Sequence, residues 1–385
     1  MKGYQFEDTQ GTFHLKKAEN ISYLYFPIAG EAGLKSSFTP NLGGDAKIDQ
    51  NTFLLEPVSA ENLVNNRNSR NFWCNVKGIG SWSLTGHSAE ELSKKFTEMQ
   101  DDSEVTAGFM WQKTTRESKK YQLRGEILSF IPVDKNVEIM LVTITNTGRM
   151  AQTVTPTAAI PLYGRSADNI RDHRHVTSLL HRIETTDTGV LVTPTLSFDE
   201  RGHQVNHMTY YCVGWSGNGE KPVDFYPTAE DFVGEGGNFE RPYAIVKNAE
   251  GVKAGTKIEG LEAVGGLHFS EITLEPEEEC SYLIFTGITE DIQEIRNLSK
   301  TYTTREKVLE ELEKTKAYWQ EKVNVAYHTG DSDFNQFMHW VSFQPILRRI
   351  YGCSFLPHHD YGKGGRGWRD LWQDCLALLI MNPDG

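Results

Sequence analysis

The first 290 or so residues alternate short segments rich in aromatic and β-branched side chains with turn residues, and this pattern decides the fold class. Segments of this kind occupy residues 21–28, 106–111, 121–130, 137–145, 153–160, 189–194, 208–214 and 281–285. No helical pattern separates them, so they predict antiparallel sheets packed face to face. We expect one large β-sandwich over residues 1–290, to which residues 89–96 add at most a short helix.

After residue 290 the apolar spacing changes to that of a helix. Thr303 and Glu306 have the spacing of a capping box, in which the hydroxyl and the carboxylate satisfy each other's free N–H groups. The apolar residues that follow recur three or four positions apart, at Val308, Leu309, Leu312 and Trp319. These features predict a helical linker over residues 291–328.

Residues 329–385 predict two more helices. Asp331 or Ser332 can cap the first, which contains Pro345 and ends at Gly352. The second follows a glycine-rich loop and starts at Trp368, and its last turns, residues 376–381, are apolar on every side. A helix that is apolar all round is buried, so we expect this helix in a protein interior.

Polar side chains cluster at the start of that last helix. They are Arg369, Asp370, Gln373 and Asp374 on the helix, with Lys363 and Arg366 in the loop before it. Two aromatic side chains, Tyr361 and Trp368, lie beside them as further candidate ligands. One interpretation is an ordinary solvated face. The alternative is a cavity for a polar ligand, because a buried helix exposes such groups only where its end opens into a hollow. Tryptophans beside carboxylate and guanidinium groups suit a sugar, which has an apolar face and a rim of hydroxyls.

Charge and cysteine usage exclude several classes of function. The net charge of −13 disfavours nucleic acid and anionic membranes as partners. The five cysteines include no Cys-x-x-Cys pair, which predicts reduced thiols in a cytoplasmic protein without a zinc ribbon. His358, His359 and Asp360 are adjacent, so their side chains diverge, and we expect no metal site there.

The stretch from Gly367 to Asp374 resembles the Gly-Phe-Arg-Asp-x-x-Gln-Asp motif of the cellobiose and cellodextrin phosphorylase family (glycoside hydrolase family 94), with Trp368 in place of Phe. Residues 39–45 and 163–173 also resemble this family, less specifically. The resemblance implies an N-terminal β-supersandwich, a helical linker and the first helices of an (α/α)6 barrel. The barrel would be incomplete, so we expect this chain to be the N-terminal fragment of a longer protein.

The resemblance implies an inverting glycoside phosphorylase (EC 2.4.1 class), part of whose active site is expected outside this chain. Such an enzyme cleaves β-linked gluco-oligosaccharides with inorganic phosphate as co-substrate and yields α-glucose 1-phosphate. Phosphate is already an anionic nucleophile, so one general acid suffices where an inverting hydrolase needs two carboxylates. The family's general acid and main phosphate ligands would lie beyond Gly385, so no catalytic residue is expected here, and the fragment alone is expected to be inactive. No metal or organic cofactor is implied.

By the same resemblance Asp370 binds hydroxyls of the sugar in the −1 subsite, and Arg369, Gln373 and Asp374 orient that site. The family has an arginine six residues before this Asp, where the present chain has Gly364, and Lys363 or Arg366 is the replacement we expect.

Residues 163–175 concentrate charged side chains just after a strand. The plain interpretation is a solvated loop. The resemblance implies a loop that reaches the sugar site of the partner subunit in a homodimer, with Arg165, Asp172 and Arg174 as the contacting residues.

Two other functions remain open from the sequence. One is a glycoside hydrolase on the same plan, and the other is a non-catalytic β-sandwich that binds glycans or mediates dimerisation.

Overall fold

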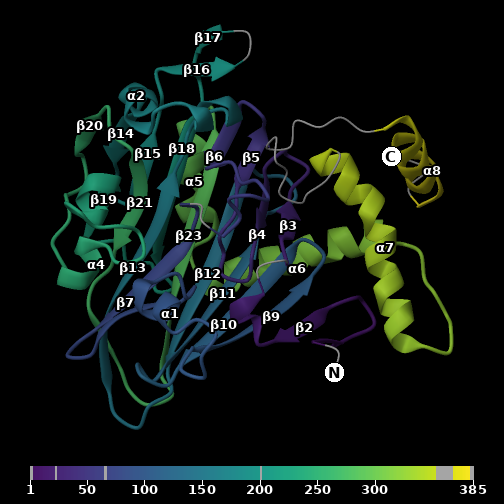
Figure 1. Ribbon diagram of the computed structural model, residues 1–385, viewed down its shortest axis with the longest axis horizontal. Coiled ribbons are helices and arrows are strands. Elements are labelled where there is room, and N and C mark those ends of the chain that lie inside the picture. Colours follow the sequence, from purple (N-terminus) through teal and green to yellow (C-terminus); the bar gives the residue numbers. More distant parts are fainter. Residues whose placement is uncertain (1–2, 22–23, 65–66, 200–201, 353–366, 382–385) are drawn as a thin grey trace.

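The computed structural model describes residues 3–21, 24–64, 67–199, 202–352 and 367–381. Two packed layers of β-sheet form most of the molecule, α6 runs across them, and helices α7 and α8 lie at one side (Figure 1). None of the described helices is long and apolar enough to cross a lipid bilayer.

The largest sheet has eleven strands in the order β1-β2-β9-β10-β11-β12-β23-β18-β15-β14-β20. In that order the strands are Tyr4–Phe6, Phe13–Lys16, Asp102–Gly108, Trp111–Ser118, Leu123–Phe130, Val137–Asn146, Glu279–Thr289, Thr209–Ser216, Gly189–Val192, Arg182–Thr185 and Lys257–Glu259. Each of their pairings is antiparallel.

Three smaller sheets accompany it, also antiparallel. The six-stranded sheet consists of β19 (Asp224–Thr228), β21 (Ala263–His268), β13 (Gln152–Leu162), β7 (Asn71–Val76), β8 (Gly80–Ser83) and β22 (Ile272–Leu274). The four-stranded sheet consists of β3 (Phe26–Ala29), β4 (Lys35–Phe38), β5 (Ala46–Asp49) and β6 (Thr52–Leu55), and the two-stranded ribbon of β16 (Leu196–Asp199) and β17 (Gly202–Val205).

Strand β12 shows how the layers share the core. Every residue of β12 is buried. Because successive side chains along a strand point to opposite faces, both faces of β12 must be covered. Met140 and Val142 belong to the apolar core between the sheets. Ile139 and Leu141 point the other way and pack under the helices α5 and α6. The predicted antiparallel β-sandwich is confirmed, with helices covering the outer face of its large sheet.

The helices are short within the sandwich and longer after it. They are α1 (Ala89–Ser93), α2 (Arg174–Thr177), α3 (Ala229–Val233), α4 (Tyr243–Lys247), α5 (Ile292–Thr301), α6 (Arg305–Lys322), α7 (Ser332–Tyr351) and α8 (Trp368–Met381), with single 3-10 turns at Ala18–Asn20, Ala167–Arg171 and Ser178–Leu180. The expected change from strands to helices near residue 290 is therefore confirmed. The (α/α)6 barrel and the domain boundaries that the sequence suggests remain predictions.

Helix α7 is anchored to the sandwich by aromatic packing. The ring of Phe109, in the turn between β9 and β10, lies 4.7 Å from Trp340 and 4.7 Å from Phe343, centroid to centroid. The Trp340 indole also donates a hydrogen bond to the Gly11 carbonyl at 2.7 Å. Buried Trp319 of α6 completes this cluster, so the two long helices and the sheet share one apolar contact.

Three local expectations need correction. Residues 106–111 are two strands and a turn rather than one strand, because Met110 adopts a left-handed backbone (φ 62°) that reverses the chain. The strand expected over residues 21–28 begins only at Phe26. The N-cap of α6 is Thr304, so the capping box expected from Thr303 is wrong. Asp331 does cap α7, since its Oδ1 accepts the Phe334 N–H at 3.1 Å.

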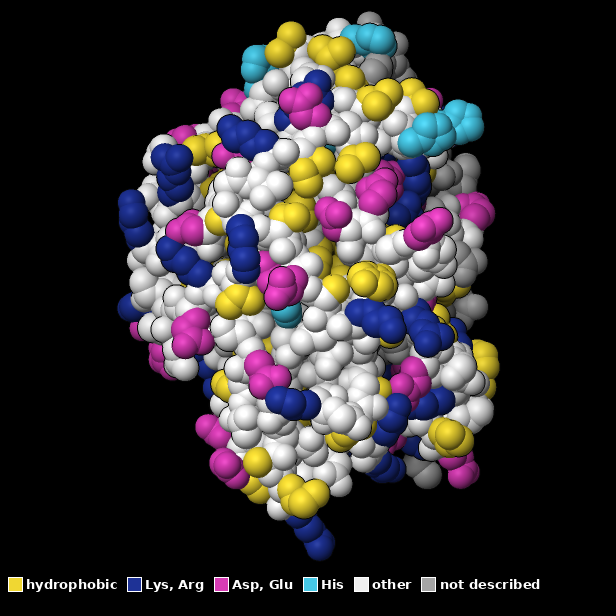
Figure 2. Space-filling view, turned by 90° about the vertical axis from the view of Figure 1, so that its left-hand side faces the viewer, with side chains coloured by type: hydrophobic (Ala, Val, Ile, Leu, Met, Phe, Trp, Pro, Cys, Tyr) yellow, Lys and Arg dark blue, Asp and Glu magenta, His cyan; other side chains and the backbone are white. Residues whose placement is uncertain are grey.

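Charged side chains of both signs are interspersed on the face that carries α4, β19 and β20. Figure 2 shows Lys and Arg alternating there with Asp and Glu. The net charge of −13 is therefore not gathered into one acidic patch on this face.

Candidate functional site

Helix α8 starts at Trp368, as expected, but most of its apolar side chains are not buried. Trp368 is 77% exposed and Trp372 is 63% exposed, and their rings lie 6.2 Å apart in a stacked arrangement. Leu376, Leu379 and Ile380 are also exposed. The expectation of a buried helix is therefore wrong for the described residues. Its physical cause is that α8 packs chiefly against one neighbour, α7.

The four polar residues of α8 do not share one environment. Asp374 is buried and accepts a hydrogen bond from the Arg348 guanidinium of α7 at 3.2 Å. Arg369 and Gln373 are exposed, and the Asp370 side chain is 49% exposed with the Arg369 guanidinium 3.5 Å away. Asp374 thus ties the helix to its neighbour, while Arg369 and Gln373 are exposed and Asp370 is half-exposed.

The loop before α8 lies outside the described residues. The predicted ligands Tyr361, Lys363 and Arg366 belong to it, as do His358 to Asp360, and their roles stay predictions. Among the described residues, the open end of α8 offers two stacked indoles, a carboxylate and a guanidinium. Such a set can stack on a sugar face and exchange hydrogen bonds with hydroxyls.

Segment 163–175 does not form a simple solvated loop. Arg165 is 7% exposed, and its guanidinium lies 3.8 Å from Glu262 Oε1. Arg174 forms an ion pair with Glu56 and places its Nη1 3.5 Å from Glu262 Oε1. Asp172 is exposed and accepts a hydrogen bond from Asn169 at 2.9 Å. Of the three predicted partner-loop residues, Arg165 is therefore buried, Arg174 is partly exposed and Asp172 is exposed.

No sequence motif marks the carboxylates that bind these arginines. Glu56 and Glu262 are distant in the chain, and Arg67 also binds Glu262, at 2.9 Å. They surround a cavity of about 20 Å³, the size of a water site. Burial lowers the pKa of Arg165, an effect that Tyr163 and Glu262 oppose. This cluster orders segment 163–175 against the sandwich.

Residues 39–45 have a structural role in the sandwich core. The Arg70 guanidinium donates hydrogen bonds to the carbonyls of Leu42, Gly44 and Asp45 at 3.4, 3.1 and 3.2 Å. It also forms a buried ion pair with Glu138 of β12. Arg70, immediately before β7, thereby joins residues 39–45 to the large sheet.

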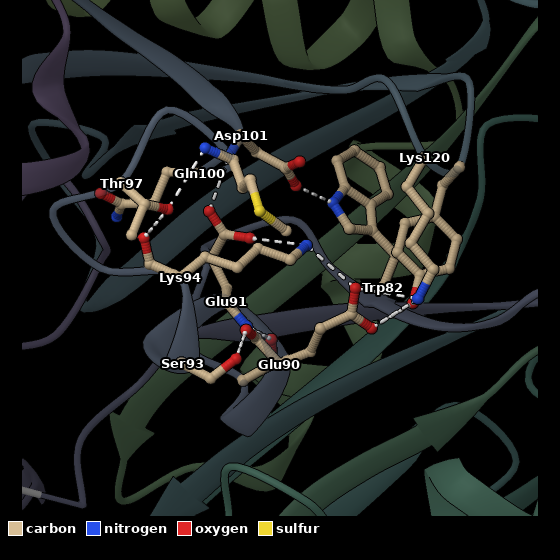
Figure 3. A network of polar contacts seen from close by, with 12 residues as sticks. Trp82, Glu90, Glu91, Ser93, Lys94, Thr97, Gln100, Asp101 and Lys120 are labelled. Carbon is tan, nitrogen blue, oxygen red and sulfur yellow. Dashed lines mark hydrogen bonds and ion pairs between the residues drawn. The ribbon is translucent and has the colours of Figure 1, made fainter.

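A further polar network surrounds α1, and no sequence motif marks it. Lys120 donates to both carboxylate oxygens of Glu90, at 2.9 and 2.8 Å, and Lys94 donates to the same group at 2.9 Å (Figure 3). Burial alone would raise the pKa of Glu90, but the hydrogen bonds from Lys120, Lys94 and Tyr121 outweigh it and lower the pKa to about 2. Glu90 is therefore a fixed anion at neutral pH.

The described part of the chain contains no group of three or more His, Cys, Asp or Glu side chains arranged to bind a metal ion. Within these residues Cys74, Cys212, Cys280 and Cys375 are free thiols.

Solved structures with a similar course of the chain come from several carbohydrate-active proteins. A bacterial glucoamylase solved with acarbose is 9% identical with a TM-score of 0.40, and the match covers 87% of this chain and 40% of the glucoamylase. A putative aldose 1-epimerase from Escherichia coli K12 is 9% identical with a TM-score of 0.36, covering 69% of this chain and 98% of that one. A family GH92 α-mannosidase from Bacteroides thetaiotaomicron is 11% identical with a TM-score of 0.40, covering 86% and 38%.

At these TM-scores the likeness says nothing about activity, and this chain spans about 40% of the length of the glucoamylase. No curated protein sequence matches the chain. The sequence does match a family model, that of the glycosyl hydrolase 94 supersandwich domain, over residues 55–305. The matched segment extends from the end of β6 to the start of α6, and so spans most of the sandwich. The chain belongs to the glycosyl hydrolase 94 supersandwich family.

Proposed function

We propose that this chain is the N-terminal part of an inverting glycoside phosphorylase. The enzyme would cleave β-linked gluco-oligosaccharides with inorganic phosphate and release α-glucose 1-phosphate. The observation that carries the proposal is the family match over residues 55–305, followed in the same chain by the Gly367–Asp374 motif at the start of α8.

In this proposal the sandwich supports the site and α8 contributes to it. Asp370 would accept hydrogen bonds from hydroxyls of the sugar at the cleaved bond, since an ionised carboxylate is a strong acceptor. The half-exposed position of its side chain leaves the oxygens accessible to a ligand. Asp374, held by Arg348, would fix the orientation of the helix that carries Asp370.

The reaction needs one general acid to protonate the leaving oxygen, while phosphate attacks the anomeric carbon from the opposite face. That single displacement inverts the β-linkage to an α-phosphate. The general acid is expected beyond Gly385, so no residue of this chain is given that role. No metal or organic cofactor is proposed.

The partner loop is part of the same proposal. Asp172 is exposed, and Arg174 is about one-third exposed, so both can approach a second copy of the protein. Arg165 would act from beneath, by holding segment 163–175 in place through Glu262. A homodimer in solution is the expected assembly.

The reverse reaction provides the test. The product of the complete reading frame is incubated with α-glucose 1-phosphate and, separately, cellobiose, laminaribiose, sophorose or glucose, and released phosphate is measured. Phosphate release that requires an acceptor supports the proposal. Release of free glucose from the oligosaccharides in the absence of phosphate would instead identify a hydrolase.

A further inference from the structure

A hollow lined by both polar and apolar side chains lies in the sandwich domain, far from α8. Its volume is about 430 Å³, within the range of about 300–1,000 Å³ typical of small-molecule sites. The strands β7 and β8, the helix α1 and the segment around Pro242 line it. Figure 1 places α1 and α4 near the left of the molecule and α8 at its right edge.

The floor of this hollow is held rigidly by Glu90, Lys120 and Tyr121. The Tyr121 hydroxyl lies 2.8 Å from Glu90 Oε2 and 3.0 Å from the carbonyl oxygen of Ser81. Lys120 bridges both oxygens of Glu90 (Figure 3). Because these contacts exist before any ligand arrives, little side-chain entropy would be lost on binding.

Several polar groups around the hollow keep hydrogen-bonding capacity to spare. The exposed Arg241 guanidinium has no side-chain partner among the described residues. The Ser88 hydroxyl accepts the Glu91 N–H at 3.2 Å, which leaves its own proton to donate. Glu240 has one oxygen 3.2 Å from His87, and its carboxylate keeps lone pairs that can accept further hydrogen bonds. The hollow thus offers both donors and acceptors.

Charge and apolar surface together restrict the ligand. The charged lining residues balance, with Glu90 and Glu240 against Lys120 and Arg241, so the hollow has no net charge that would select an ion. Its wall includes Ile79 and Val246, which are 40% and 42% exposed, and Pro242 beside them. Balanced hydrogen-bonding groups next to exposed apolar carbon suit the hydroxyl rim and C–H face of a sugar.

We propose that this hollow is a non-catalytic binding site for a short, neutral oligosaccharide. Arg241, Ser88 and Glu240 bind its hydroxyls, and Ile79 and Val246 contact its apolar face. That the oligosaccharide is built of glucose rests on the proposed function. Binding itself requires no turnover, no phosphate and no residue of α8.

Lysine footprinting tests the location. The 385-residue chain is acetylated with and without cellotetraose, and modification is measured at each lysine by mass spectrometry. Lys120 lines the hollow, whereas the neighbouring Lys119 has a side chain that is 91% exposed and does not line it. We expect cellotetraose to slow modification of Lys120 at least threefold and to leave Lys119 unchanged. Equal rates at Lys120 with and without cellotetraose would overturn the proposal.

Titration calorimetry with the same sugar tests the contacts. Arg241→Ala removes an exposed donor without disturbing an ion pair among the described residues, and we expect about tenfold weaker binding from the loss of one charged hydrogen bond. Arg296→Ala, on the exposed side of α5, is the matched control and should bind like the unmodified chain. Equal affinity of all three proteins would overturn the assignment of Arg241.

Sodium sulfate serves as the competing probe. A site for a neutral sugar predicts that Lys120 is acetylated at the same rate in sodium sulfate as in sodium chloride of equal ionic strength. Protection of Lys120 by sulfate as strong as that by cellotetraose would mean an anion site and would contradict the proposal. Failure to detect phosphorolysis would not affect these tests, because lysine footprinting and titration calorimetry report binding alone.

Discussion

The buried ion pair between Arg70 and Glu138 provides the sharpest test of how this sandwich is held together. Both side chains have no exposure to solvent. The guanidinium makes five contacts, two to Glu138 and three to carbonyl oxygens of residues 42–45. Since a guanidinium has five N–H groups, no donor is left unused. Glu138 also accepts the Ser36 hydroxyl, so the pair links β4, β12 and the residue that immediately precedes β7.

The geometry sets the size of the expected effect. Arg70→Met would leave a buried carboxylate without its counter-charge and would remove three hydrogen bonds to backbone carbonyls. Removal of one partner of such a pair costs about 3–5 kcal/mol. Glu138→Gln keeps the shape of the side chain but leaves the buried guanidinium without its counter-charge. We therefore expect the free energy of unfolding to fall by a similar amount. The double variant should be less destabilised than the sum of the two single variants by about 2 kcal/mol, because no buried charge then remains.

Urea unfolding followed by tryptophan fluorescence measures these free energies. Arg296→Met, at an exposed position of α5, is the control and should change the free energy of unfolding by no more than about 0.5 kcal/mol. A loss below about 1 kcal/mol for Arg70→Met would refute the reasoning. Strict additivity in the double variant would show that the two groups do not stabilise the fold as a pair.

Other predictions concern titration, α8 and the proposed site. Burial lowers the pKa of His181 to about 3, so the folded protein keeps this imidazole neutral. Above the unfolded pKa of about 6.5 the imidazole is neutral in both states, and its titration does not affect stability. Between about pH 6.5 and pH 3 only the unfolded chain is protonated, so the free energy of unfolding falls by about 1.4 kcal/mol per pH unit. Urea midpoints at several pH values should lose this slope in His181→Asn. Asp374→Ala removes the contact with Arg348, so limited proteolysis should cut near α8 sooner while the sandwich unfolds at the same urea concentration. Asp370→Asn should leave the circular dichroism unchanged but lower turnover about 10- to 100-fold, since a charged hydrogen bond is worth about 1.5–3 kcal/mol; wild-type turnover would remove Asp370 from the site.

The class of the fold could be predicted from local sequence, because β-strands and helices have different apolar periods. The strand at residues 137–145 and the helix after Asp291 are examples, and both are present as β12 and α5. Turn positions were less predictable. Met110 takes a left-handed backbone although it is not a glycine, and burial of the turn under α7 stabilises it there.

The surroundings of side chains could not be predicted, because they depend on contacts between distant segments. The inward turn of Arg165 depends on Glu262, and the fixed charge of Glu90 depends on Lys120; neither pair lies close in sequence. The apolar pattern of α8 predicted burial, but burial requires a partner surface, and among the described residues only α7 supplies a substantial one. Periodicity reports which face is apolar, not what covers it.

The most direct test of the central claim is to follow cellobiose cleavage by the complete gene product with proton and phosphorus NMR, with and without inorganic phosphate. We predict that cleavage requires phosphate and that the first glucosyl product is α-glucose 1-phosphate. Glucose release at the same rate without phosphate, or a β-phosphate as the first product, would contradict the account of this protein as an inverting phosphorylase.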